Sequence, residues 1–259
     1  MSDHRARKRF GQHFLTAADT IEQIVAAVAP QQGETIVEIG PGQAAITAPL
    51  ADLATTLHAI EFDRDLVTTL RQRFAGRENV VIHQADALSF DFASLGNNLR
   101  IVGNLPYNIS TPLLFHLLGF KDVIADMHFM LQKEVVERMA AVPGSKRYGR
   151  LTIMLGCHLE VVHLFDVPPS AFSPPPKVMS SVVRMRPIPQ PAFDINDAEL
   201  FEKLVKQAFS RRRKTLRNAL DGLASAADIQ SAGLDSSQRP EQIPIAGWVN
   251  LANLLADSQ

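Results

Sequence analysis

Short β-branched apolar runs alternate with stretches of helical periodicity over most of this chain. The first helical stretch, at residues 16–29, places apolar residues three or four positions apart on one face: Ile21, Ile24, Val25 and Val28. Strands are predicted at residues 35–40, 57–63, 80–83, 100–103, 126–131, 161–165 and 181–185. Helices are predicted at residues 44–53, 64–74, 111–118, 132–141 and 149–157. This alternation predicts an α/β fold built on an open sheet.

The pattern changes after a proline-rich linker formed by Pro187, Pro189 and Pro191. Beyond it the periodicity is helical only, with one long helix predicted at residues 199–220 and shorter ones at 224–231 and 245–256. We therefore expect two domains. Residues 1–188 form the larger α/β domain, and residues 189–259 form a small helical domain.

The composition argues against several classes of function. The net charge is −1, so a nucleic-acid partner would have to be bound by local basic patches. The single cysteine, Cys157, excludes an internal disulfide and suits a reducing cytosol. Scattered histidines predict no metal site. The basic start lacks the apolar core of a secretory signal, and no run reaches the roughly 18 apolar residues that span a bilayer.

The first predicted strand ends in Gly40-Pro41-Gly42, and a predicted helix follows. Strand, glycine turn and helix open a nucleotide-binding βαβ unit, in which glycines let the backbone approach a ligand closely. The third glycine of a pyrophosphate-binding turn is missing. The motif therefore fits either a ligand without phosphates or a simple tight turn.

One acidic residue lies near the end of the next strand, and another lies just beyond the strand after that. Glu61 lies about 20 residues beyond the glycine turn, the spacing at which an acid reaches ribose hydroxyls. Asp86 follows the third strand and could accept a hydrogen bond from a second nucleoside group. Carboxylates at strand ends are also common as solvated loop residues. Their occurrence in series favours ligand contacts, because parallel strands bring their carboxyl ends to one edge.

The fourth strand delivers Asn104-Leu105-Pro106-Tyr107 to the same edge. Asn104 carries an amide oxygen, and Pro106 restrains the Leu105 carbonyl to one direction. These two acceptors beside the Tyr107 ring suit a planar group with an exocyclic amine, such as adenine. An ordinary turn at a strand end is the alternative, since Asn and Pro are common turn residues.

Several further residues are candidates for contact with a nucleic acid. A triple-proline loop presents Phe172 and Lys177, either as a rigid connector or as an aromatic wall for a flipped base with a cation beside it. The amino-terminal arm carries Arg5, Arg7, Lys8 and Arg9. The long carboxyl-terminal helix carries Arg211, Arg212, Arg213, Lys214 and Arg217. Such runs are often solvated faces, but in a chain of net charge −1 they indicate phosphate binding.

A nucleoside cofactor without phosphates fits these observations, and S-adenosylmethionine is the common one. Its activated methyl group requires the protein only to align the reactants. The adenine amine is a poor nucleophile because its lone pair is delocalised into the ring. Acceptors on Asn104 and Leu105 would favour a pyramidal nitrogen in the transition state. Tyr107 and Phe172 would stack on the base outside its helix.

The chain resembles the ribosomal RNA adenine N6,N6-dimethyltransferase family over nearly its whole length. The motifs that carry the resemblance are RARKRFGQ at 5–12, VEIGPG at 37–42, NLPYNIS at 104–110, FMLQKE at 129–134 and PPPKV at 174–178. The resemblance implies a class I methyltransferase fold, Rossmann-like with a seven-stranded sheet, and a helical carboxyl-terminal domain. It implies dimethylation of two adjacent adenosines near the 3′ end of 16S rRNA in the assembling small subunit, by a cytoplasmic monomer. It places cofactor contacts at His13, Leu15, Gly40, Gly42, Glu61, Asp86 and Asn104.

One position departs from the family pattern, and two other functions stay open. The family usually has Asn where this chain has His13, so His13 contacts the cofactor through either its ring or its backbone. One alternative function is adenine methylation of 23S rRNA or DNA, against which the motif at 174–178 and the length of the match argue. The other is a non-catalytic ribosome-assembly factor, against which Glu61, Asp86 and the motif at 104–107 argue.

Overall fold

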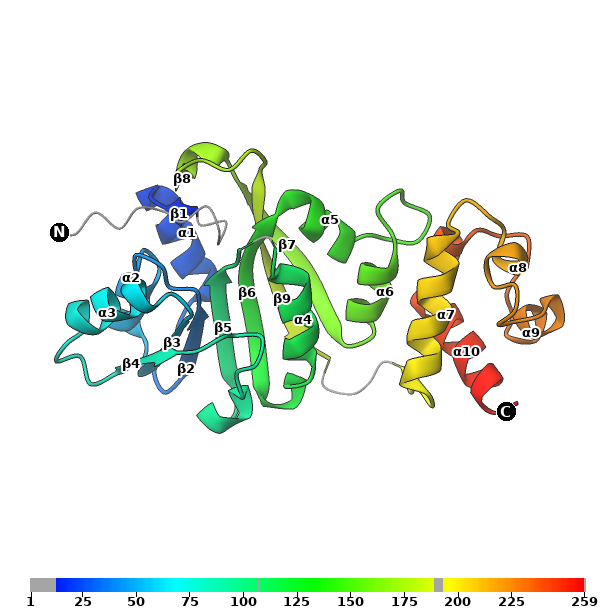
Figure 1. Cartoon of the computed structure of the whole chain (residues 1–259), viewed down its shortest axis with the longest axis horizontal. Coiled ribbons are helices and arrows are strands. Elements are labelled where there is room, and N and C mark those ends of the chain that lie inside the picture. Colours follow the sequence, from blue (N-terminus) through cyan, green and yellow to red (C-terminus); the bar gives the residue numbers. More distant parts are fainter. Residues whose placement is uncertain (1–12, 107, 189–192, 259) are drawn as a thin grey trace. The chain divides into compact units, whose positions relative to one another are not determined.

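The computed structural model describes residues 13–106, 108–188 and 193–258. Its chain divides into two compact units (Figure 1). The first unit comprises Met1–Val136 and Val162–Pro187. The second comprises Glu137–Val161 and Ile188–Gln259.

A seven-stranded sheet forms the first unit, in the order β4-β3-β2-β5-β6-β9-β7. Its strands are β2 (Thr35–Ile39), β3 (Thr56–Glu61), β4 (Val80–Gln84), β5 (Leu99–Asn104), β6 (Ile124–Gln132), β7 (Leu159–Val167) and β9 (Ser180–Pro187). Strands β2 to β6 pair in parallel, and β9 is antiparallel to β6. This topology confirms the predicted α/β class and the seven-stranded sheet.

Helices cover the sheet because each one buries a single apolar face. Their bounds are α1 (Ala18–Val28), α2 (Thr47–Leu53), α3 (Arg64–Arg73), α4 (Ser110–Leu118) and α5 (Lys133–Met139). In α3, the Asp63 side chain caps the amino terminus by accepting from the Asp65 N–H, and Leu66, Val67 and Leu70 are buried. Short 3₁₀ helices occur at Phe92–Leu95, Lys121–Val123, Pro169–Ala171 and Pro240–Gln242.

A second, two-stranded sheet was not predicted from the sequence. Strands β1 (Phe14–Leu15) and β8 (Phe172–Ser173) pair antiparallel, with Phe14 opposite Ser173 and Leu15 opposite Phe172. The Ala171 carbonyl extends this contact by accepting from the N–H groups of Thr16 and Ala17. The segment before α1 is thereby joined to the triple-proline loop.

The second unit is a helical bundle around the fully buried Trp248. Its helices are α6 (Arg150–Gly156), α7 (Ala198–Ser210), α8 (Leu216–Ala219), α9 (Ala226–Ser231) and α10 (Ile245–Ala256). We expected the helical domain to comprise residues 189–259 only. In the structure, residues 137–161 also belong to this unit. Tyr148, Ile153 and Cys157 pack in its core, and the Tyr148 hydroxyl donates to the Ile243 carbonyl at 2.8 Å.

The prediction of a single helix at residues 199–220 is wrong. Helix α7 ends at Ser210, and α8 begins at Leu216. The Leu216 N–H donates to the Gln238 carbonyl at 2.7 Å, and its side chain is fully buried. In one continuous helix the like charges of Arg213 and Arg217, four positions apart, would also repel each other. Burial of Leu216 against the bundle therefore outweighs the local helical preference of this segment.

Candidate functional site

The carboxyl ends of β2, β3, β4 and β5 surround a cavity of about 250 Å³, which we call the strand-end cavity. Among the residues that line it are the predicted contacts His13, Leu15, Gly40, Gly42, Glu61, Asp86, Asn104, Leu105 and Pro106. Parallel pairing explains this convergence, since every one of these strands ends at the same edge. The cavity is therefore built from residues far apart in the sequence.

The first wall is the glycine turn after β2. Gly40 has φ +70° and Gly42 has φ +55°, conformations that favour glycine. A β-carbon on Gly42 would also lie 3.2 Å from the Phe14 ring. The turn therefore keeps bare backbone at the cavity, as a closely approaching ligand requires.

Glu61 is buried at the end of β3 and accepts from several backbone N–H groups. Its Oε1 accepts from Asp63 at 2.8 Å, and its Oε2 accepts from Gly42 at 3.2 Å. Burial raises the pKa of this carboxyl, and the N–H groups of Asp63 and Gly42 oppose that rise. The Phe62 N–H also interacts with this carboxylate, which has about four lone-pair positions, so Glu61 keeps the capacity to accept from a ligand hydroxyl.

Glu38 is a cavity residue that sequence reasoning missed. It lies in β2, is 2 % exposed and lines the strand-end cavity. Burial raises the pKa of Glu38 to about 7, while the neighbouring Thr47 hydroxyl lowers it and the Glu61 charge raises it further. The available signal was a carboxylate inside an otherwise apolar strand, where burying an isolated charge is unfavourable.

Asp86 lies beyond β4, on the rim of the strand-end cavity. Its side chain is exposed, and its Oδ1 accepts from the Leu88 N–H at 2.9 Å. That bond orients the carboxylate and leaves further lone pairs for a ligand.

Asn104 ends β5 and borders the strand-end cavity, half-buried. Its Nδ2 donates to the His13 carbonyl at 3.0 Å. This bond assigns the amide orientation, since the amino group faces His13 and Oδ1 is left as an acceptor. Gly103 permits the geometry, because a β-carbon there would lie 2.6 Å from the Ile39 carbonyl oxygen.

Leu105 and Pro106 leave the sheet directly after Asn104. The Leu105 N–H donates to the Met130 carbonyl at 3.2 Å, and the Leu105 side chain is 1 % exposed. The backbone that carries the Leu105 carbonyl is thus anchored on one side by the sheet and on the other by the proline ring. Tyr107, the predicted stacking residue, lies outside the described residues.

His13 joins the cavity to the triple-proline loop. Its Nδ1 lies 2.8 Å from the Pro174 carbonyl, while its own carbonyl accepts from Asn104. Leu15, two residues on, is buried in β1. The β1–β8 pairing therefore helps to set the orientation of the Asn104 amide.

Phe172 does not form the predicted aromatic wall. It is 4 % exposed and packs in the core of the first unit. Its pairing with Leu15 across β1 and β8 turns the ring inward. Too little of its surface is exposed for a base to stack on it.

The predicted RNA-binding cations fall into three groups. Arg5, Arg7, Lys8 and Arg9 lie outside the described residues. Lys177, Arg211, Arg213, Lys214 and Arg217 are exposed. Arg212 is half-buried; it donates to the Ser145 carbonyl at 3.2 Å and lies 3.7 Å from a Glu241 carboxylate oxygen. Arg212 therefore connects parts of the helical unit.

Within the residues that the structure describes, no group of three or more His, Cys, Asp or Glu side chains is arranged to hold a metal ion. None of the described helices combines the length and the apolar character needed to cross a membrane.

Comparison with known proteins connects this geometry to a family. The model of the family described as ribosomal RNA adenine dimethylase matches residues 3–257. Ribosomal RNA small subunit methyltransferase A of Pseudomonas putida is 54 % identical over 259 residues, which cover 99 % of this chain and 97 % of that protein. The protein of the same name from Chromobacterium violaceum is 54 % identical over 258 residues, 99 % of this chain and 98 % of that one.

Solved structures agree with the sequence comparison. A dimethyladenosine transferase from Plasmodium falciparum superimposes with a TM-score of 0.81 and 25 % identity, covering 92 % of this chain and 96 % of that one. The 23S rRNA methyltransferase ErmE has a TM-score of 0.73 and 24 % identity, over 94 % of this chain and 99 % of its own. The second likeness shows that the fold is shared.

Proposed function

The chain belongs to the ribosomal RNA adenine dimethylase family, and on that premise we propose that it transfers methyl groups from S-adenosylmethionine to the N6 atoms of two adjacent adenosines near the 3′ end of 16S rRNA. We assign it to the assembling small subunit, in the cytoplasm and as a monomer. The observation that carries the proposal is Asn104 at the strand-end cavity, whose amino group donates to the His13 carbonyl, so that its amide oxygen is the atom left to act as an acceptor.

The strand-end cavity fits the cofactor. The glycine turn would let backbone approach a nucleoside, and Glu61 would accept from the ribose. Asp86 would accept from a second nucleoside group at the rim. Glu38 adds a buried carboxylate oxygen without a hydrogen-bond partner among the described residues. S-adenosylmethionine, when bound, supplies a methyl group activated by its positive sulfur.

Asn104 would act on the acceptor amine of adenine. In the first transfer its Oδ1 would accept one N–H and the Leu105 carbonyl the other; in the second transfer N6 has a single N–H left, which one of these two acceptors would bind. Both interactions favour a pyramidal nitrogen whose lone pair is available for attack, so they strengthen in the transition state. The proton can leave after transfer, so these residues need to supply alignment and no general base. Tyr107 keeps its predicted role as the stacking ring.

Replacing Glu61 with alanine should weaken binding of S-adenosylhomocysteine by roughly tenfold to a hundredfold, because hydrogen bonds to a charged group contribute about 1.5–3 kcal/mol. Loss of the bonds to Gly42 and Asp63 would also loosen the glycine turn. Isothermal titration calorimetry measures the affinity. The exposed Glu78, replaced by alanine, is the control. An unchanged affinity for Glu61→Ala would assign this carboxylate a structural role only.

The exposed cations of the helical unit should bind RNA phosphates. Replacing Arg211, Arg213 and Lys214 with glutamine should lower the slope of log K against log salt by about 0.7–0.9 for each lost phosphate contact. Arg212→Gln is the matched control, because its guanidinium is bound to Ser145 and lies near Glu241. We expect it to lower the thermal midpoint and leave the salt slope near wild type. If the triple variant keeps the wild-type salt slope, Arg211, Arg213 and Lys214 face solvent and do not bind RNA phosphates.

Mass spectrometry of rRNA tests the proposed function. Cells that lack this protein should lose dimethyladenosine near the 3′ end of 16S rRNA, and the purified protein with S-adenosylmethionine should restore it. Methylation confined to 23S rRNA or DNA would support the alternative substrates. Restoration of subunit assembly by Asn104→Ala without any methylation would support an assembly factor.

A further inference from the structure

A second hollow lies at the opposite end of the parallel strands. It has a volume of about 860 Å³ and is lined by the segment between α1 and β2, by the start of β5 and the residues before it, by the first half of β6 and by the end of β9. We call it the amino-end groove. Its side chains are predominantly polar, and Gln31, Asn98, His128, Arg184 and Arg186 are among them. The catalytic proposal above uses none of these residues.

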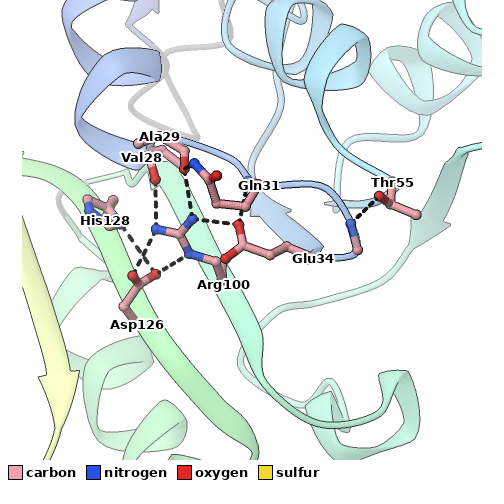
Figure 2. Close-up of polar contacts among 9 residues, drawn as sticks. Val28, Ala29, Gln31, Glu34, Thr55, Arg100, Asp126 and His128 are labelled. Atoms are coloured by element: carbon pink, nitrogen blue, oxygen red, sulfur yellow. Dashed lines mark hydrogen bonds and ion pairs between the residues drawn. The ribbon is translucent and has the colours of Figure 1, made fainter.

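Among the described residues that line the groove, Arg100 is a cation that is paired with two carboxylates (Figure 2). Its guanidinium forms two bonds with Asp126, at 3.0 and 2.9 Å, and one with Glu34 at 2.7 Å. It also donates to the Val28 carbonyl at 2.7 Å and to the Ala29 carbonyl at 3.3 Å. The two carboxylates that line the groove, Glu34 and Asp126, therefore both bind Arg100. Neither can fully neutralise the positive charge of a further cation.

Arg184 and Arg186 are those further cations. In the β6–β9 register Arg184 lies opposite His128, and Arg186, two residues along, has its side chain on the same face. Arg184 is half-buried and Arg186 is exposed. The buried Nε of Arg184 has no hydrogen-bond partner among the described residues. Two neighbouring arginine residues thus line the groove.

His128 adds a buried polar group to the same place. It is 3 % exposed, and its Nε2 has no hydrogen-bond partner in the described part of the chain. Its Nδ1 makes only a long contact with Asp126, 3.5 Å from Oδ1 (Figure 2). Buried polar groups without partners are unfavourable, so a ligand oxygen near His128 and Arg184 would stabilise this arrangement.

Phosphate is the ligand group that fits best. Arginine presents a planar fork of donors that matches phosphate oxygens, and it is the usual residue for nucleic-acid backbones. The Gln31 amide already donates to the Ala29 carbonyl at 3.0 Å, but its oxygen and the Asn98 amide can bond to the sugar or base on either side of the phosphate. We propose that the amino-end groove binds a backbone phosphate of the RNA substrate, an inference that rests on the proposed function and extends it to the opposite end of the sheet.

The first test is the salt dependence of RNA binding by the full chain. A fragment of 16S rRNA containing the 3′ end serves as the probe. Arg184→Gln/Arg186→Gln should lower the log–log salt slope by about 0.7–0.9 for each lost phosphate contact. Arg64→Gln/Arg71→Gln removes two exposed cations from α3 and should leave the slope near wild type. The single variant Arg186→Gln, at an exposed position, gives the same test if the double variant does not fold.

A second measurement identifies the source of the phosphate. The imidazole resonances of His128 are followed by NMR during titration with the RNA fragment and, separately, with inorganic phosphate. A shift with RNA that the double variant abolishes supports the proposal. A shift with inorganic phosphate alone, or an unchanged salt slope in both groove variants, overturns it. Methylation of the RNA by the wild type is measured in parallel. A groove that binds no phosphate can then be distinguished from a protein that does not methylate the RNA.

Discussion

Replacing Asn104 with alanine should lower kcat for rRNA methylation by about 10²-fold or more, the scale of losing one transition-state hydrogen bond. Alanine removes the Oδ1 acceptor that would bind the adenine amine. It also frees the His13 carbonyl, which receives the Asn104 amino group at 3.0 Å. The rate is measured by transfer of labelled methyl groups to 16S rRNA under single-turnover conditions.

Two controls separate a catalytic role for Asn104 from a structural one. Affinity for S-adenosylhomocysteine should change much less than kcat, because the lost interaction forms with the adenine amine. Asn104→Asp keeps an acceptor but places a carboxylate oxygen against the His13 carbonyl, so we expect a partial loss of rate. Near wild-type methylation by Asn104→Ala would contradict the activation of the amine.

Replacing Arg100 with methionine should lower the free energy of unfolding by about 3–5 kcal/mol, the usual effect of removing one partner from a buried ion pair. The change leaves Asp126 buried without its two bonds and removes the donors to the Val28 and Ala29 carbonyls at the end of α1 (Figure 2). Urea unfolding of the full chain measures the loss.

A second variant shows whether the isolated charge is the cause. Arg100→Met/Asp126→Leu removes both charges, so it should be more stable than Arg100→Met alone. Burial alone would raise the pKa of Asp126, but the His128 and Arg100 side chains outweigh it and hold that pKa at about 2. The stability from this pair is therefore present above pH 4 and is lost as the pH falls toward 2. The difference in the free energy of unfolding between wild type and Arg100→Met should narrow as the pH falls and Asp126 becomes protonated, and a constant difference would contradict the ion-pair account.

Much of this protein is determined by short-range sequence pattern. The β-branched runs and the apolar helical faces predict the strands and helices of the sheet, because periodicity of two or 3.6 residues decides which side chains can be buried. The glycine turn, Glu61, Asp86 and Asn104 were placed at one edge by the rule that parallel strands share their carboxyl ends. The structure brings them to one cavity.

Contacts between distant segments were decided only by the tertiary structure. The pairing of Leu15 with Phe172 buries a ring that the sequence left as a candidate for base stacking. The bond from Asn104 to the His13 carbonyl crosses 91 positions, so its direction could not be read from the motif. Burial of Leu216 likewise ended a helix that local propensity would have continued.

The buried charged residues also show which features the sequence predicts and which depend on the tertiary structure. Glu38 and Arg100 both stand in apolar strands, and the sequence marks them as unusual without saying what compensates them. The fold surrounds Arg100 with Asp126, Glu34 and two helix-end carbonyls, while it leaves Glu38 at a cavity with a raised pKa. A pattern along the chain predicts which face of an element is buried. The charge balance at each buried site depends on neighbours that only three-dimensional packing brings together.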